Sequence, residues 1–187
     1  MELQGERLIP ADVQRTWAAL NDPLILKDCI AGCESLERTG DDAFHAVVAV
    51  KVGPVSARFK GSLKMSNVQA PTAYTINFEG QGGPAGFAKG SADVSLVPEG
   101  DDTRLRYAAR AQVGGKMAQI GSRLIDAAAG KVTDEFFNAF EERLRPVAPA
   151  ELVVPTAEAS AKTTDLRMLW WLIAALIALA VAYFALR

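Results

Sequence analysis

The chain has 187 residues, and its 20 Lys and Arg residues nearly balance its 22 Asp and Glu residues, giving a formal net charge of -2. This charge disfavours nucleic acid as a partner, because a basic excess is needed to hold a phosphate backbone. The two cysteines, Cys29 and Cys33, lack the partners of a zinc site and the spacing of a thioredoxin-type redox pair. We expect them to be small reduced thiols. The length suffices for one globular domain, at residues 1–145.

Period-two alternation of apolar and polar residues predicts several strands. In the clearest segment, residues 55–66, Val55, Phe59 and Leu63 face one way, while Ser, Arg and Lys residues face the other. The same pattern covers residues 74–80 and 104–113, and weaker versions cover residues 3–9, 44–52 and 88–96. Short turns containing Gly or Pro separate these segments. Consecutive strands joined in this way predict an antiparallel meander with one apolar face.

Helical segments flank the predicted meander. Residues 11–20 form a short amphipathic stretch after the first strand, and Pro23 opens a second one toward Cys29. After the last strand, apolar residues recur every three or four positions from Met117 to Leu144, which predicts one long amphipathic helix. The apolar face of this helix needs an apolar surface of matching size, and the one-sided sheet supplies it. The sequence therefore predicts an α+β fold in which a curved antiparallel sheet wraps around the last helix.

The end of the chain is typical of a tether followed by a membrane anchor. Residues 146–166 are rich in Pro and Ala, have no amphipathic period, and predict a linker with a mean span of about 25 Å. The anchor, residues 167–187, contains the uncharged run Met168–Leu186, which as a helix would span about 28 Å of a hydrocarbon core that is roughly 30 Å thick. We expect one transmembrane helix.

The residues around this run agree with a membrane span. Trp170, Trp171 and Tyr183 lie near its two ends, where amphipathic rings prefer the headgroup layer. The alternative is a buried helix, but a helix that is apolar on every face needs more surrounding protein than the chain supplies. We expect the protein to be located at the cytoplasmic membrane, with the domain on the cytoplasmic side.

The sequence contains no recognisable catalytic, metal-binding or phosphate-binding set. His45 is the single histidine, and the alternation places it on the polar face of a strand. The glycines between Gly80 and Gly86 precede a strand, so they cannot present the helix N-terminus that binds phosphate. We expect no catalytic residues and no metal site.

Small residues are frequent on the predicted inner face of the sheet. They are Ala46, Ala57, Gly61, Gly80, Ala88, Gly90, Ala92, Ala109 and Ala111. They allow two interpretations: they permit close approach of the helix to the sheet, or they leave an apolar cavity for a nonpolar ligand. Tyr74 and Tyr107 are the titratable groups that we place inside, either holding the polar end of a ligand or packing as core residues.

Four segments resemble the CoxG family, named for the G subunit of carbon monoxide dehydrogenase, within the START-like (SRPBCC) helix-grip superfamily of hydrophobic-ligand carriers. They are residues 30–38, 50–61, 82–96 and 112–137. One departure is Ala31, at a position where the family often has Pro. The resemblance implies a helix-grip fold and a non-catalytic accessory protein that recruits a molybdenum hydroxylase, typically carbon monoxide dehydrogenase, to the inner face of the cytoplasmic membrane.

A cavity next to a membrane anchor suggests that the ligand is a membrane quinone, which would accept electrons from the docked enzyme. The candidate lining residues are Phe59, Leu63, Phe78, Tyr107, Ile120, Leu124, Val132 and Phe136. The candidate docking residues lie in one loop at the rim: Gly82, Gly83, Pro84, Gly86 and Phe87. A plain hairpin turn is the alternative for this loop.

Two other functions remain open from the sequence. One is a lipid carrier without a redox partner. The other is a cyclase or dehydratase acting on polyketides, which would need an acid or base poised near neutral pH inside the cavity. We expect the accessory function, because the titratable groups that we place on the inner face are tyrosines.

Overall fold

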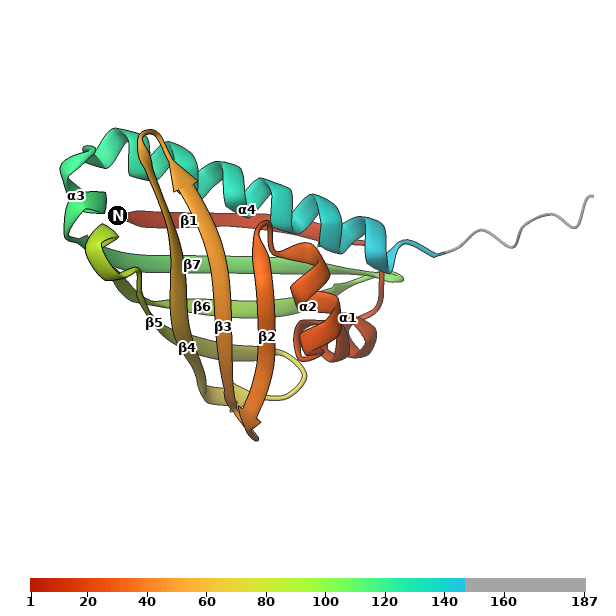
Figure 1. The fold of residues 1–187 in the computed structure, drawn as a ribbon. Coiled ribbons are helices and arrows are strands. Elements are labelled where there is room, and N and C mark those ends of the chain that lie inside the picture. Colours follow the sequence, from red (N-terminus) through yellow and green to blue (C-terminus); the bar gives the residue numbers. More distant parts are fainter. Residues whose placement is uncertain (147–187) are drawn as a thin grey trace, which may run out of the picture. The chain divides into compact units, whose positions relative to one another are not determined.

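The computed structural model describes residues 1–146, whose arrangement Figure 1 shows. The chain begins with β1 (Glu2–Ile9), α1 (Val13–Leu20) and α2 (Pro23–Cys29). A meander follows, with β2 (Cys33–Gly40), β3 (Ala43–Val52), β4 (Val55–Gln69), β5 (Ala73–Gln81), β6 (Phe87–Glu99) and β7 (Asp102–Gly114). A short 3-10 helix, η1 (Gly83–Ala85), lies between β5 and β6, and α3 (Lys116–Gln119) and α4 (Ser122–Leu144) come last.

The strands form one antiparallel sheet of seven strands in the order β1-β7-β6-β5-β4-β3-β2. The predicted meander is confirmed for β2 to β7, and β1 adds to the outer edge of β7. The sheet is curved, and α4 crosses its concave side close to β1 (Figure 1). This arrangement is consistent with the predicted helix-grip fold.

The predicted linker beyond Pro146 and the predicted transmembrane helix lie outside the described residues. Within residues 1–146, no helix has both the length and the apolar composition that crossing a bilayer requires.

The first two helices begin at aspartate caps. The Asp12 carboxylate accepts a hydrogen bond from the Arg15 amide at 2.9 Å at the start of α1. Asp22 accepts one from the Leu24 amide at 2.8 Å at the start of α2, where Pro23 occupies the first helical position. Both caps satisfy amide groups that have no partner within the helix. They fix the residues at which the two helices begin.

The single helix predicted from Met117 to Leu144 is wrong, because the chain breaks into α3 and α4. Gly121 lies at the break with a φ of +94°, a conformation that residues with a Cβ rarely adopt. The predicted apolar face is also shifted. Leu124 is 52% exposed, whereas Phe137 is buried. Spacing across a break does not determine which side of the second helix meets the sheet.

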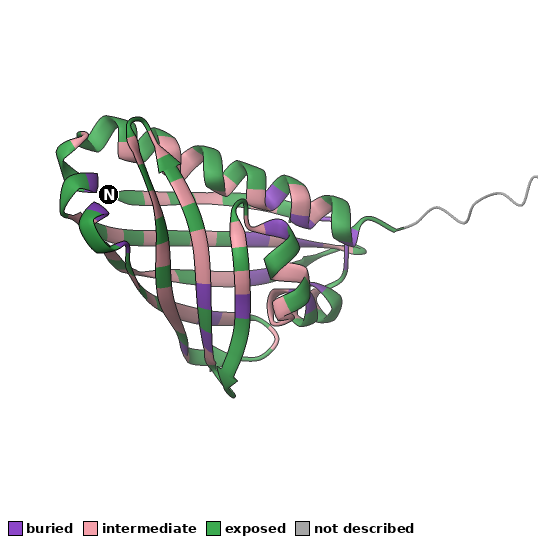
Figure 2. Cartoon of the chain, in the orientation of Figure 1, coloured by how far each residue is buried: buried purple, intermediate pink, exposed green. Residues whose placement is uncertain are grey.

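Two apolar clusters fill the end of the sheet that carries α1 and α2, as Figure 2 shows. The first contains Ile9, Ala11, Ala19, Cys29, Leu96, Leu105, Phe137, Phe140 and Leu144. The second contains Leu36, Phe44, Ala46, Met65 and Tyr74. Trp17 packs against both clusters and meets Tyr74 edge to face, with ring centroids 5.3 Å apart. The buried residues of α4 all belong to its C-terminal half.

Two fully buried threonines donate hydrogen bonds to a backbone carbonyl inside this end of the sheet. Thr103 of β7 donates to the Ala11 carbonyl at 2.7 Å, and Thr16 of α1 donates to the same oxygen at 3.3 Å. Because a buried carbonyl without a partner is costly, these bonds tie the turn after β1 to both elements.

Two glycine substitutions test the break between α3 and α4. Gly121→Ala should destabilise the protein by about 1–2 kcal/mol, because an alanine is strained at this positive φ. Gly130→Ala should stabilise it by about 0.5–1 kcal/mol, because Gly130 lies inside α4 with open space at its Cβ position. Thermal unfolding followed by circular dichroism measures both changes. A continuous helix would instead be stabilised by both substitutions.

Candidate functional site: the open end of the grip

Strand register aligns the small residues of the concave face in adjacent rows. One row runs through Ala46, Gly61, Gly80, Ala88 and Val113. The next runs through Phe44, Leu63, Phe78, Gly90 and Ala111. Both rows cross from β3 to β7, so the small residues lie side by side in the middle of the sheet.

One half of the concave face is not filled by the two clusters, and we call it the open end. Its apolar side chains are only half-buried, among them Val50, Ala57, Phe59, Ala88 and Val113. The β3–β4 turn, η1 and α3 form the rim of this end, because β3, β5 and β7 all finish there. Figure 2 shows half-buried and exposed residues along this half of the strands.

Aromatic rings packed on glycines explain part of the small-residue pattern. A Cβ at Gly5 would lie 2.5 Å from the Tyr107 hydroxyl oxygen, and one at Gly82 would lie 2.7 Å from Cζ of Phe59. A Cβ at Gly90 would lie 2.0 Å from the Arg110 carbonyl oxygen and 2.9 Å from Cζ of Phe78. These glycines therefore allow close approach. The groups that approach them are rings and backbone atoms of the sheet, whereas the sequence-based interpretation expected α4.

The predicted lining residues divide into three groups. The first lies on the sheet, and the second lies at the filled end, by which we mean the end of the sheet that the two apolar clusters occupy. Phe59, Leu63 and Phe78 are half-buried on the concave face, where Leu63 packs against the second cluster. Tyr107 and Phe136 belong to the filled end, where Tyr107 stacks on Phe137 with centroids 5.1 Å apart and Phe136 stacks on Phe140 at 5.6 Å. Phe59 and Phe78 therefore lie outside both clusters, whereas Leu63, Tyr107 and Phe136 pack against them.

The third group, Ile120, Leu124 and Val132, lies on the α3–α4 segment. Ile120 is half-buried at the end of α3, beside the rim, whereas Leu124 and Val132 are exposed. Helical geometry places Val132 nearly opposite Asp134, which contacts β1, so Val132 lies on the flank of α4 turned away from β1. The structure therefore does not enclose these two α4 side chains.

The concave side carries a charged residue, Arg7, in addition to the two tyrosines that the sequence predicts. Tyr74 is buried against Trp17, and desolvation raises its pKa above the usual value, so it behaves as a core residue. Arg7 also lies on this side, where it forms an ion pair with Asp134 of α4 and stands over the Phe137 ring, 5.6 Å from the centroid. The alternation of β1 could have revealed Arg7, because it is in phase with the half-buried Gly5.

The predicted docking loop lies at the rim of the open end. Ala85 is buried, and a Cβ at Gly86 would overlap the Gly114 carbonyl, so the loop is pressed against the end of β7. Gly83 and Pro84 are exposed, and Phe87 is 39% exposed while its ring covers Gly114. The loop thus presents an exposed tip on an anchored base.

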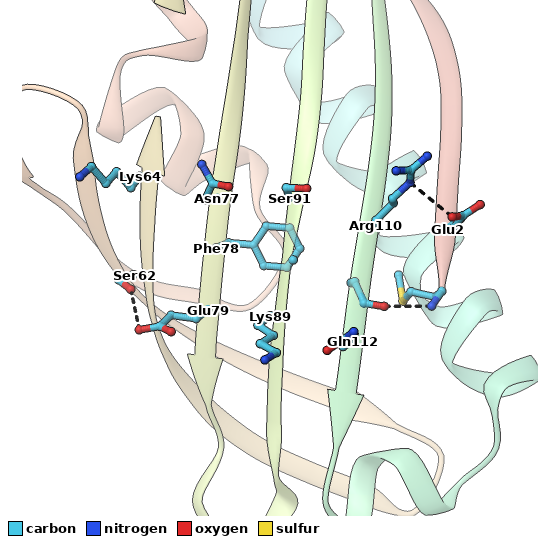
Figure 3. A pocket seen from close by; sticks show the side chains of 13 residues that line it. Glu2, Ser62, Lys64, Asn77, Phe78, Glu79, Lys89, Ser91, Arg110 and Gln112 are labelled. Atoms are coloured by element: carbon cyan, nitrogen blue, oxygen red, sulfur yellow. Dashed lines mark hydrogen bonds and ion pairs between the residues drawn. The ribbon is translucent and has the colours of Figure 1, made fainter. Parts of the chain in front are cut away.

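The outer face of the sheet carries a hollow of about 860 Å³ across β4, β5, β6, β7 and the start of β1, lined by polar side chains and also by Phe78. Figure 3 shows the side chains that line it, with Lys64, Asn77, Ser91 and Arg110 in one register row. His45 is exposed on the same outer face, and within residues 1–146 no three His, Cys, Asp or Glu side chains gather as metal ligands would.

The two cysteines are free thiols at the junction of α2 and β2. Cys29 is buried and Cys33 is half-buried, with its sulfur 3.4 Å from the Ser35 carbonyl oxygen. Burial raises the pKa of both thiols, and the neighbouring Asp28 carboxylate raises that of Cys29 further.

We expect both thiols to react slowly with a disulfide reagent such as DTNB at pH 8, because a raised pKa leaves less thiolate at that pH. Cys29 should be the slower one, and both rates should rise as the pH increases. The reaction is followed by absorbance at pH 8, in buffer for the native chain and in urea for the unfolded chain. The Cys29→Ser and Cys33→Ser variants assign each kinetic phase to one thiol. Equal rates in the native and unfolded chains would contradict this assignment.

The family model described as CoxG, the G subunit of carbon monoxide dehydrogenase, matches residues 5–145. A conserved protein of known structure from Geobacillus kaustophilus is 30% identical, with a TM-score of 0.72 over 77% of this chain and 95% of that chain. A START superfamily protein from Mycobacterium smegmatis is 17% identical (TM-score 0.58, 76% and 96% covered). The Zhui aromatase/cyclase from Streptomyces sp. R1128 is 12% identical (0.59, 77% and 93%). The last two show the fold alone, and no curated protein matches the sequence.

Proposed function

Because the chain belongs to the CoxG family of carbon monoxide dehydrogenase, we propose that it is a non-catalytic accessory protein that recruits a molybdenum hydroxylase to the cytoplasmic membrane. In this proposal the open end of the grip holds the apolar part of a membrane quinone or a similar lipid. The quinone would accept the electrons that the docked hydroxylase releases.

The observation that carries the ligand proposal is the half-buried apolar surface of the open end. Folding normally removes such side chains from water, since burial contributes about 25 cal/mol per Å² of apolar area. Phe59, Ala88 and Val113 remain half-buried although they face the concave side. A nonpolar ligand would cover this surface and gain the same free energy.

The membrane part of the proposal rests on residues 147–187 and on the family. The uncharged run Met168–Leu186 has the length and flanking aromatic residues of a single span. With a linker of about twenty residues, the domain would stay within about 25 Å of the bilayer on average. We place the domain on the cytoplasmic side, where a molybdenum hydroxylase would be brought.

A lipid carrier without a redox partner is the second candidate, because the open end favours an apolar ligand whatever the domain docks to. A cyclase has less support. Its chemistry needs a general acid or base near the ligand, and the polar side chains that the structure places on the concave side include Tyr74, Tyr107 and Arg7. The likeness to an aromatase/cyclase is one of fold.

Filling the open end should remove a bound ligand. Ala88→Phe places a ring among half-buried apolar neighbours, and we expect at least about tenfold less co-purifying quinone, a change of about 1.4 kcal/mol in binding. Ala49→Phe makes the same change on the exposed side of β3 and should leave the quinone content as in the wild type. The full chain is purified from its own membranes, and its lipids are extracted and measured by mass spectrometry. Absence of any near-stoichiometric quinone or isoprenoid in the wild type would contradict the ligand proposal.

Deleting residues 167–187 should move the protein and its hydroxylase from the membrane to the soluble fraction while leaving their association intact. The physical reason is that the deleted run is the proposed hydrophobic anchor, whereas the deletion leaves residues 1–146 unchanged. Fractionation with immunoblotting of both proteins, followed by co-precipitation, measures the outcome. If the truncated chain still sedimented with membranes, the anchor would not be the main attachment.

A further inference from the structure

The outer face of the sheet carries charges of both signs, with acidic residues at Glu2, Glu6, Glu79 and Asp93 among a larger number of basic ones. β4 directs Arg58, Lys60 and Lys64 outward, and β7 directs Arg104, Arg106 and Arg110 outward. Several of these arginines are paired: Arg58 with Glu34, Arg104 with Glu6 and Glu99, and Arg106 with Glu6. Within residues 1–146, Lys64 and Lys89 have no ion-pair partner at salt-bridge distance.

Both of these lysines line the outer hollow of about 860 Å³ (Figure 3). Lys64 of β4 lies opposite Asn77 of β5, and Lys89 of β6 lies opposite Glu79 of β5. The two lysines are therefore two strands apart, in adjacent register rows. Strand spacings of about 4.8 Å and a rise of about 3.4 Å per residue put their Cα atoms roughly 12 Å apart. Carboxylates four residues apart in an extended peptide have nearly the same separation.

The floor between the lysines combines hydrogen-bonding side chains with the Phe78 ring, which Figure 3 shows among them. Asn77, Ser91 and Gln112 offer both donors and acceptors to a peptide backbone that crosses the strands. The Ser62 hydroxyl lies 3.5 Å from the Glu79 carboxylate, and Arg110 lies 3.3 Å from Glu2 in a pair whose side chains are 82% and 79% exposed. An exposed pair of this kind contributes little to stability, so a partner carboxylate can compete for Arg110.

We propose that this hollow is the docking surface for an extended acidic segment of the partner hydroxylase, with Lys64 and Lys89 as its two charge contacts. The proposal rests on the recruiting function and deepens it. A bilayer is the other negatively charged surface that a basic face can meet, but a flat membrane does not fill a hollow. The hollow also adjoins the predicted docking loop, since Glu79 and Lys89 lie a few residues outside its ends. The loop and the hollow would form one continuous surface.

The test compares two double variants of equal charge change in the full chain. Lys64→Glu/Lys89→Glu reverses the proposed contacts. Lys27→Glu/Lys131→Glu makes the same change on α2 and α4, where both lysines are exposed. Each chain is placed in uncharged phosphatidylcholine vesicles, mixed with purified carbon monoxide dehydrogenase from the source organism, and assayed by co-flotation. We expect at least about tenfold weaker binding for the first variant only, and weaker wild-type binding at higher salt.

Two further measurements separate this proposal from the recruiting function. A fluorescent twelve-residue glutamate-rich peptide should bind the wild type and the control variant but not Lys64→Glu/Lys89→Glu. If the enzyme bound all chains equally, the surface would be wrong and the recruiting function would stand. If the enzyme bound none of them while the peptide result held, the recruiting function would be wrong and an acidic-peptide surface would stand. If the reversal weakened binding to phosphatidylglycerol vesicles but not to the enzyme or the peptide, a membrane contact would replace the proposal.

Discussion

The structure depends on the packing of the C-terminal half of α4 into one end of the curved sheet. Phe140 is fully buried there, and Phe137 stacks on Tyr107 while Arg7 pairs with Asp134 across the same contact. Large aromatic side chains bury enough area to hold a helix against a sheet without any covalent link. Because α1 and α2 cover the same end, nearly the whole core is gathered on one side of the molecule.

Because the large side chains gather at the filled end, few large side chains cover the open end. The N-terminal half of α4 contributes no buried residue, and the inner row of the sheet there is built from Gly80, Ala88 and similar small residues. Aromatic rings cover some of the glycines, which limits how much of the open end is free. What remains is an apolar surface with incomplete burial, next to a rim that includes the exposed tip of the β5–β6 loop. The ligand proposal and the docking proposal therefore concern opposite faces of the same strands.

Much of the fold could be predicted because alternation is a local property. Each strand in residues 43–113 has one apolar face, and short turns leave an antiparallel meander as the simple solution. The prediction failed where a backbone conformation changed direction, at Gly121, and where a charged residue occupied an inward position, at Arg7. The first error depends on one φ angle. The inward position of Arg7 could have been read from the alternation of β1, but its ion pair with Asp134, 127 residues away in the chain, could not.

The sequence by itself determined the strand faces, the α+β class and the family, because these follow from local periodicity and from long matching segments. The tertiary structure decided which small residues make room for rings, which end of the grip is filled, and where Leu124 and Val132 lie. It also brought Lys64 and Lys89 to one hollow from strands that are separated in sequence. These features depend on register and on helix placement, which arise from contacts between distant segments, and periodicity along one segment carries no information about them.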